Sequence, residues 1–175
     1  MKKILKFLGV ILLLVLIYCG IAILAFDKAY HYEQSVVINA PAEKVWQYTN
    51  SLRGYNMWDP FSKEDKDVKI EYSGNSGEIG DSYHWTGRES GEGTQTISKL
   101  VPNQLMETDL HFIKPFESDA KSRFALTPEA GKTKVTWAMD FEMDPLMKPM
   151  KPLMDMNMKK MFEKGLGNLK SLAEK

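Results

Sequence analysis

Few side chains in this sequence are of the types that carry out covalent or metal chemistry. The three histidines, His31, His84 and His111, are far apart and show no H-x-x-x-H spacing. The single cysteine, Cys19, lies inside a long apolar run, and no G-x-S-x-G motif marks a nucleophilic serine. The sequence therefore does not support a nucleophilic triad or a histidine-rich metal centre, and we predict no catalytic residue, no metal and no cofactor.

The polar groups of the middle region allow only weaker interpretations. His84 in "SYHWTG" and His111 in "DLHFI" alternate away from the apolar positions of their segments, which favours solvated strand residues over an acid or a base. Arg88, Glu89 and Glu92 in "GRESGEGTQ" form either a solvated hairpin end or a charged cavity rim. Both interpretations of this charged group stay open at the level of the sequence.

Methionine is the most unevenly distributed residue type. Seven of the eleven methionines fall between residues 143 and 161. Their flexible, polarisable thioethers suit ordinary helix packing, an adaptable wall for a lipophilic ligand, or copper(I) binding. Competition by copper(I) chelators would separate the last interpretation from the other two.

The elements that position these residues begin with a strand at 30–39, on which Tyr32, Val36 and Ile38 share one face. Asn39 or Ala40 is expected to cap the following helix. The apolar face of this helix contains Ala42, Val45, Trp46 and Thr49. A second short helix, capped by Ser51, is expected to end at Asp59-Pro60, where the chain returns to the sheet.

The middle of the chain predicts about six further strands with turns at short intervals, typical of an antiparallel meander. They lie at residues 68–72, 82–87, 93–101, 104–113, 122–127 and 133–143. Because two short helices separate the first strand from the second, we expect these two strands to pair from opposite sides of the sheet. The helical pair would then close one end of the sheet.

The C-terminal region changes to helical periodicity. Residues 153–174 predict a long amphipathic helix, and the three prolines between 144 and 153 exclude a continuous helix before it. Gly165 adjoins the apolar stripe, which indicates a close approach to the sheet or to a ligand, whereas Gly167 has no such explanation. The resulting fold class is α+β, with a curved antiparallel sheet covered by the terminal helix.

The N-terminal region predicts a membrane anchor. Residues 7–26 contain no charge, and 20 helical residues span about 30 Å, the thickness of a bilayer core. A cleaved signal peptide has a shorter apolar run than this one. A bacterial lipoprotein requires a small residue immediately before its modified cysteine, whereas here Tyr18 precedes Cys19. We therefore predict an uncleaved anchor at 1–28 and one domain at 29–175.

The charge distribution predicts orientation and excludes one class of partner. Three lysines, Lys2, Lys3 and Lys6, precede the apolar run. After the run, the opposite charges of Asp27 and Lys28 cancel each other. The positive-inside rule then places the N-terminus in the cytoplasm and the domain on the extracytoplasmic side. The residues after Lys28 carry 19 basic and 22 acidic side chains, a net charge of −3 without a basic stripe, so we predict no nucleic-acid partner.

Three segments together resemble a known superfamily: "VVINAPAEKVWQYTNSLRGYNMWDPF", "GEGTQTISKLVPNQLMETDLHF" and "FEKGLGNLKSL". They are similar to the START-like, helix-grip (SRPBCC) superfamily, and more narrowly to its polyketide cyclase/dehydrase-like branch, over about residues 33–174. The resemblance implies six to seven strands wrapped on a long C-terminal helix, two short helices after the first strand, and a deep apolar cavity between sheet and helix.

Our first hypothesis is a membrane-tethered domain that binds a hydrophobic or amphipathic small molecule or lipid in this cavity. The expected lining is Tyr83, Trp85, Met106, Leu110, Phe112, Phe124, Trp137, Met139, Met158, Met161 and Phe162. One alternative is a cyclase- or dehydrase-type enzyme for an aromatic or polyketide-like substrate, which rests on the resemblance alone. Another is a non-catalytic envelope interaction protein whose cavity is filled by its own side chains.

Overall fold

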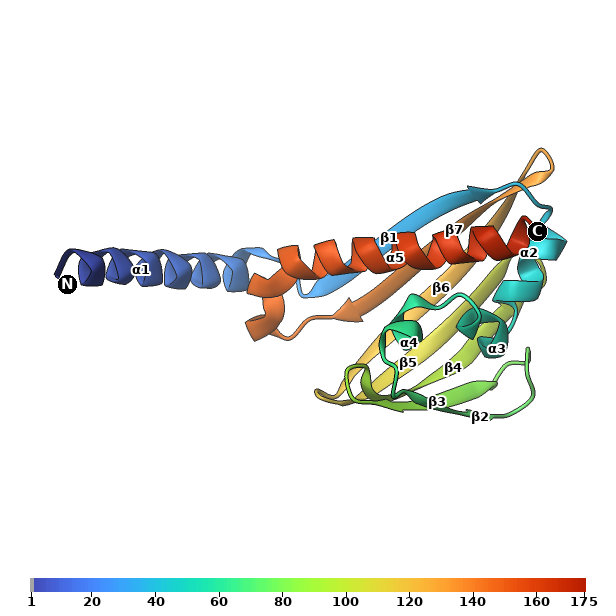
Figure 1. Ribbon diagram of the computed structural model, residues 1–175, viewed down its shortest axis with the longest axis horizontal. Coiled ribbons are helices and arrows are strands. Elements are labelled where there is room, and N and C mark those ends of the chain that lie inside the picture. Colours follow the sequence, from blue (N-terminus) through green and yellow to red (C-terminus); the bar gives the residue numbers. More distant parts are fainter. Residues whose placement is uncertain (1) are drawn as a thin grey trace.

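A seven-stranded antiparallel sheet forms the centre of the structure, which a computed structural model describes for residues 2–175 (Figure 1). The helices are α1 (Lys2–Ala25), α2 (Ala42–Thr49), α3 (Leu52–Asn56), α4 (Pro60–Glu64), the 3-10 helix η1 (Pro145–Met150) and α5 (Lys151–Ala173). The strands are β1 (Ala29–Ile38), β2 (Lys69–Ser73), β3 (Ser82–Gly87), β4 (Gly91–Val101), β5 (Leu105–Lys114), β6 (Ser118–Glu129) and β7 (Lys132–Glu142).

The order of the strands confirms that the first two strands lie at opposite sides of the sheet and contradicts the predicted pairing between them. The sheet runs β1-β7-β6-β5-β4-β3-β2, so β1 and β2 lie at opposite edges and do not pair with each other. β1 pairs instead with β7, the last strand in the sequence. The physical reason is that α2, α3 and α4 carry the chain across the sheet from one edge to the other before the meander begins.

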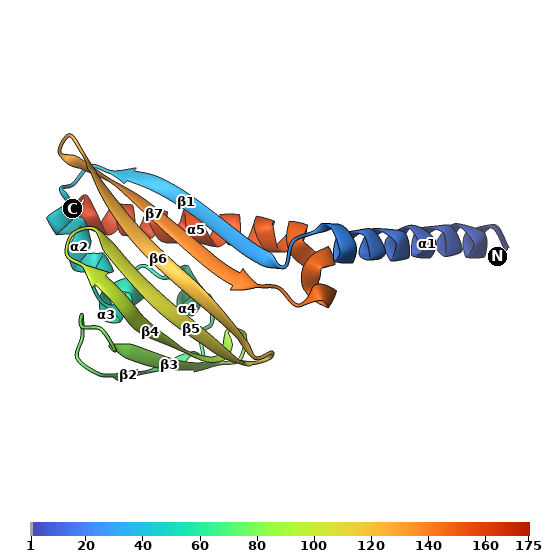
Figure 2. The ribbon, with the colours of Figure 1, turned by 180° about the vertical axis from the view of Figure 1, so that it is seen from behind.

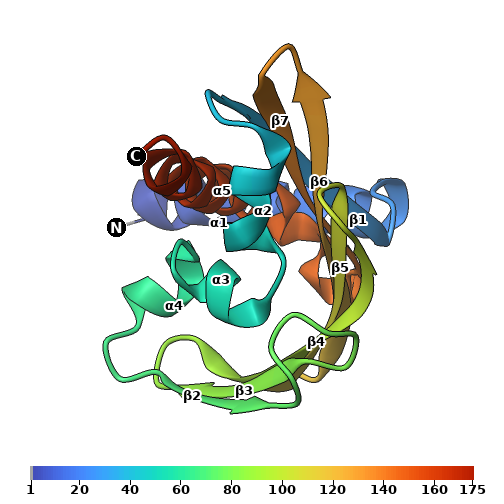
Figure 3. The same cartoon turned by 90° about the vertical axis from the view of Figure 1, so that its right-hand side faces the viewer.

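All the helices after α1 lie on one side of the sheet. α5 packs along β1, and α2, α3 and α4 lie beside it within the curve of the sheet (Figure 3). From the opposite side the strands lie in front, and within residues 2–175 no helix covers that outer face (Figure 2). The predicted α+β class and helix-grip arrangement are confirmed, with the apolar helix α1 added at the N-terminus.

Three short helices follow β1, where two were predicted. The Asp59 carboxylate accepts hydrogen bonds from the backbone amides of Phe61, at 3.0 Å, and Ser62, at 2.9 Å. Asp59-Pro60 therefore begins α4, as a capping residue followed by proline, and does not return the chain to the sheet.

The predicted cap of α2 was also wrong, because Pro41 occupies that position. Ser51 caps α3 as predicted, through the Gly54 amide at 3.1 Å.

Aromatic side chains form the part of the core that joins the short helices to the sheet. The ring of Trp58, between α3 and α4, meets that of Trp137 on β7 edge to face, with centroids 5.3 Å apart. Phe124 on β6 packs against both rings. Trp58 Nε1 donates a hydrogen bond to the Tyr48 carbonyl at 2.9 Å. Trp58 therefore has its indole N–H satisfied while its ring stays fully buried.

Candidate functional site

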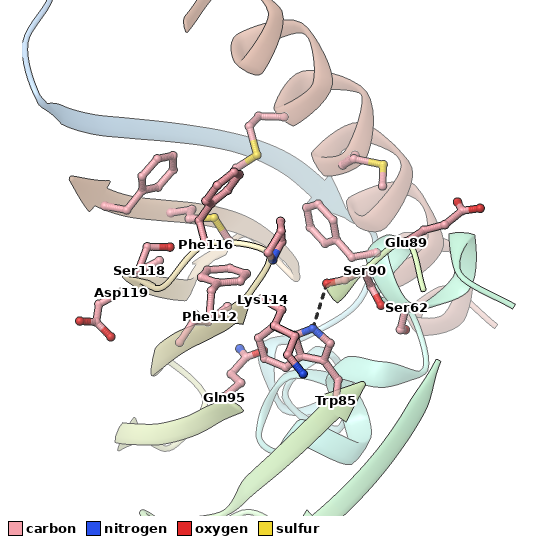
Figure 4. A pocket seen from close by; sticks show the side chains of 18 of the residues that line it. Ser62, Trp85, Glu89, Ser90, Gln95, Phe112, Lys114, Phe116, Ser118 and Asp119 are labelled. Carbon is pink, nitrogen blue, oxygen red and sulfur yellow. Dashed lines mark hydrogen bonds between the residues drawn. The ribbon is translucent and has the colours of Figure 1, made fainter. Parts of the chain in front are cut away.

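A cavity of about 1190 Å³ lies between the inner face of the sheet and the helices (Figure 4). Strands β2 to β7, helices α3, α4, η1 and α5, and the β3–β4 and β5–β6 turns all contribute to its wall. Most of the lining is apolar and includes Phe61, Val68, Ile70, Trp85, Leu110, Phe112, Met139, Phe141, Met143, Met154, Met158 and Met161. The space is larger than the roughly 300–1,000 Å³ of a typical small-molecule pocket.

The cavity exists because α5 packs closely against the sheet over only part of its length. The buried residues of α5 begin at Phe162 and continue to Ala173 in the C-terminal half. In the N-terminal half, Met154, Met158 and Met161 border the cavity. The same apolar stripe therefore forms packed core at one end of the helix and a cavity wall at the other.

Seven of the eleven residues that the sequence predicted for the lining border the cavity. They are Tyr83, Trp85, Leu110, Phe112, Met139, Met158 and Met161. The remaining four, Met106, Phe124, Trp137 and Phe162, are fully buried in the core next to the cavity. Eight of the eleven lie on strands, where all except the half-buried Phe112 are buried, and the other three lie on α5. Packing decides which of them the cavity reaches.

The structure also places polar residues in the cavity wall that sequence reasoning missed, namely Tyr55, Asp59 and Gln95. Each of the three is buried. Gln95 could have been found, because it shares the inward parity of Gly93 and Ile97 on β4 and is a polar side chain on the apolar face. For Asp59, the Asp-Pro pair was a helix-start signal that we interpreted as a stop.

These polar groups form hydrogen bonds with one another and with their neighbours. The Tyr83 hydroxyl donates to Gln95 Oε1 at 2.7 Å, and Gln95 Nε2 donates to Thr108 Oγ1 at 2.8 Å. The Tyr55 hydroxyl donates to Asp59 Oδ1 at 2.8 Å. Burial, and next the negative charge of Asp59, raise the pKa of both tyrosines well above the usual value, so both hydroxyls remain protonated. The arrangement can orient the polar end of a ligand whose remainder contacts apolar walls.

The charged residues near the mouth have different roles. Glu89 borders the cavity, whereas Glu92 forms a salt bridge with Lys114 at 2.6 Å. The hydrogen bond from Lys114 lowers the pKa of the Glu92 carboxyl. Trp85 Nε1 donates to the Ser90 carbonyl at 3.1 Å, which ties the cavity wall to the β3–β4 turn (Figure 4).

Asp65 holds the same turn from the other side. One carboxylate oxygen, Oδ2, accepts from the Ser90 amide at 2.9 Å, the Ser90 hydroxyl at 2.8 Å and the Glu89 amide at 2.9 Å. Oδ1 accepts from the Asp67 amide at 3.1 Å. These hydrogen bonds, led by those from Ser90, lower the pKa of the Asp65 carboxyl to about 2. A single carboxylate thus joins the segment after α4 to the β3–β4 turn at the cavity mouth.

Histidines and methionines lie in different regions of the protein. His84 and His111 are half-exposed and lie near carboxylates, His84 near Glu92 and His111 near Asp119, outside the cavity lining. Within the described residues, 2–175, no cluster of three His, Cys, Asp or Glu side chains is arranged to hold a metal ion. Five of the seven methionines between 143 and 161 border the cavity, which favours the adaptable-wall interpretation over simple helix packing.

Residues 29–174 match the protein family described as "Polyketide cyclase / dehydrase and lipid transport". The chain belongs to this family. The match covers the whole sheet and α5, and it leaves α1 outside. No curated protein matches the chain at a significant level.

Solved structures of the same fold come from several sources. Protein CV1439 from Chromobacterium violaceum aligns with a TM-score of 0.61 at 15% identity, covering 83% of this chain and 97% of that one. A protein from Thermobifida fusca gives 0.61 at 18% identity, with 82% and 92% covered. Ara h 8.0201 gives 0.57 at 15% identity, with 82% and 99% covered. At these identities the likeness establishes the helix-grip fold alone.

Proposed function

We propose that this family member binds a hydrophobic or amphipathic small molecule or lipid in the cavity between the sheet and α5, and that α1 anchors it in a membrane. The observation that carries the proposal is the cavity itself. Its volume is about 1190 Å³, and its largely apolar wall includes a small group of polar side chains. Such a site suits a ligand with a long apolar body and a polar end.

The chemistry of the wall favours binding over catalysis. Tyr83 and Gln95 are hydrogen-bonded to each other, and the Asp59 carboxylate accepts from Tyr55 and caps α4. These groups are held by the fold and are not poised to exchange protons with a substrate. Met154, Met158 and Met161 add side chains that adapt to acyl chains or rings of different shape.

The anchor is supported by the composition and exposure of α1. Residues Lys3–Ala25 form the only helix within the described chain that is long and apolar enough to cross a bilayer. Almost all of its apolar side chains are exposed, as expected of a helix that contacts lipid and not a protein core. The lysines before it favour a cytoplasmic N-terminus, with the domain of residues 29–175 on the other side.

Native mass spectrometry of the full-length protein, extracted in mild detergent, tests the binding proposal. We expect a bound species of lipid or other lipophile that is retained at activation energies at which detergent is lost. Thermal unfolding in the presence of added phospholipids or fatty acids should shift to higher temperature. Consistently empty spectra together with unchanged melting temperatures would rule out the proposed ligand class and favour the collapsed-cavity alternative.

A further inference from the structure

Helix α1 is not a free tether, because its last two turns are docked against η1. The Tyr18 hydroxyl donates to the Pro149 carbonyl at 2.9 Å, and Lys148 Nζ donates to the Ile23 carbonyl at 3.1 Å. Ala22 is only 1% exposed, whereas most other side chains of α1 are exposed. Tyr18 lies seven residues before Ala25, about 10 Å along the helix axis. η1 therefore lies beside the apolar part of α1 and not beyond its end.

The linker and the strand register place the cavity mouth at the same end of the molecule. Only residues 26–28 separate α1 from β1, and the Met143 amide donates to the Lys28 carbonyl at 2.7 Å. The register sets the end of β7 beside the start of β6 and places the β5–β6 and β3–β4 turns at that end of the sheet (Figure 1). Both turns and η1 line the cavity.

Exposed apolar side chains are concentrated at this mouth. Leu146 in η1 is 77% exposed and Phe116 in the β5–β6 turn is 75% exposed, and both border the cavity. Met147 and Met150 of η1 and Leu153 in the first turn of α5 are exposed as well. The acidic residues Glu117, Asp119 and Asp144 and the basic residue Lys114 border the mouth, and Lys148 lies in η1, so the charge of this region is mixed. Apolar contact, rather than attraction to anionic lipid, is the interaction that this surface offers.

We infer that η1 and the β5–β6 turn, here called the rim, enter the surface layer of the bilayer that α1 crosses, so that the cavity opens directly into lipid. The inference rests on the proposed anchor and extends it from a tether to a docked orientation. The partner is a zwitterionic lipid bilayer. An apolar ligand would then move between membrane and cavity without crossing water, which removes the cost of exposing its apolar surface.

Depth-dependent quenching tests this orientation. A single cysteine carrying an environment-sensitive fluorophore is placed at Leu146→Cys or Phe116→Cys in a full-length Cys19→Ser background. The matched control is Ile79→Cys, 67% exposed in the β2–β3 loop at the far end of the sheet. The protein is reconstituted in phosphatidylcholine nanodiscs with and without doxyl-labelled lipid. We expect severalfold quenching at positions 116 and 146, and none at position 79.

A label at Leu12→Cys, inside the apolar run, separates failure of the rim from failure of the anchor. Quenching at position 12 without quenching at 116 and 146 would overturn the rim orientation and leave the anchor in place. Absence of quenching at position 12 would overturn the anchor and the orientation together. Equal quenching at 79 and at the rim would also contradict the orientation, because it would show a domain that lies on the bilayer without a preferred face.

Discussion

Gly165 of α5 lies against the ring of Trp137, so closely that a Cβ atom at position 165 would be 2.7 Å from Trp137 Cζ3. The ring cannot readily move away. It stacks on Phe162 with centroids 4.0 Å apart, and its Nε1 donates to Ser122 Oγ at 3.0 Å. The same Cβ atom would also lie 3.0 Å from Cδ of Pro60 in α4. The glycine therefore sets the closest approach of the helix to the sheet, as its place beside the apolar stripe predicted.

Gly165→Ala should destabilise the protein although alanine is the better helix former. The clash should cost about 1–3 kcal/mol, more than the ~1 kcal/mol gained in helix propensity. The control is Gly167→Ala, where the added Cβ meets nothing within 4 Å and should stabilise the fold by up to ~1 kcal/mol. Urea unfolding of the full chain in detergent micelles measures both. Equal and stabilising effects would contradict the close packing described here.

The lowered pKa of the Asp65 carboxyl predicts that the protein loses stability in acid. Its folded-state pKa is lowered from 3.8 to about 2, so its contribution is fully present above pH 3.8 and is lost as the pH falls toward 2. Asp65→Asn should be less stable than the wild type at pH 7, and the difference should shrink between pH 4 and pH 2. Thermal unfolding over this pH range provides the measurement. Asp67→Asn is the control, since that residue contributes its backbone amide and not its exposed carboxylate.

Asp59 has two roles that can be separated by mutation. Asp59→Ala removes the α4 cap, worth ~0.5–2 kcal/mol, and leaves the buried Tyr55 hydroxyl without its acceptor, at a cost of ~1–3 kcal/mol. We expect a total loss of about 1.5–5 kcal/mol in the free energy of unfolding. Adding Tyr55→Phe to Asp59→Ala should recover part of that loss. Purely additive effects of the two substitutions would show that the hydroxyl has found another partner.

Filling the cavity should reduce ligand binding. Leu110 lines the cavity from β5, and Leu110→Trp should weaken retention of a lipophile by about tenfold, equivalent to ~1.4 kcal/mol. Ile113→Trp places the same ring on the same strand at an exposed position. Titration of a fluorescent fatty acid against both full-length variants measures the difference. Similar affinities would mean that the ligand binds elsewhere.

The sequence alone determined the features that depend on local periodicity. The alternation of Val135, Trp137 and Met139 identified the inner face of β7, and the uncharged run of residues 7–26 identified α1 as an apolar helix. The Ser51 cap could also be predicted, because capping involves residues only a few positions apart. Each of these signals lies within one segment of the chain.

Only the tertiary structure decided which inward-facing side chains form the core and which line the cavity. Met161 and Phe162 are adjacent on α5, yet Met161 borders the cavity and Phe162 is fully buried against Trp137. The pairing of β1 with β7 and the docking of η1 against α1 likewise join segments more than 90 residues apart. Periodicity gives the direction of a side chain, but the space in front of it depends on how closely a distant element approaches, and that distance is set by the packing of the whole fold.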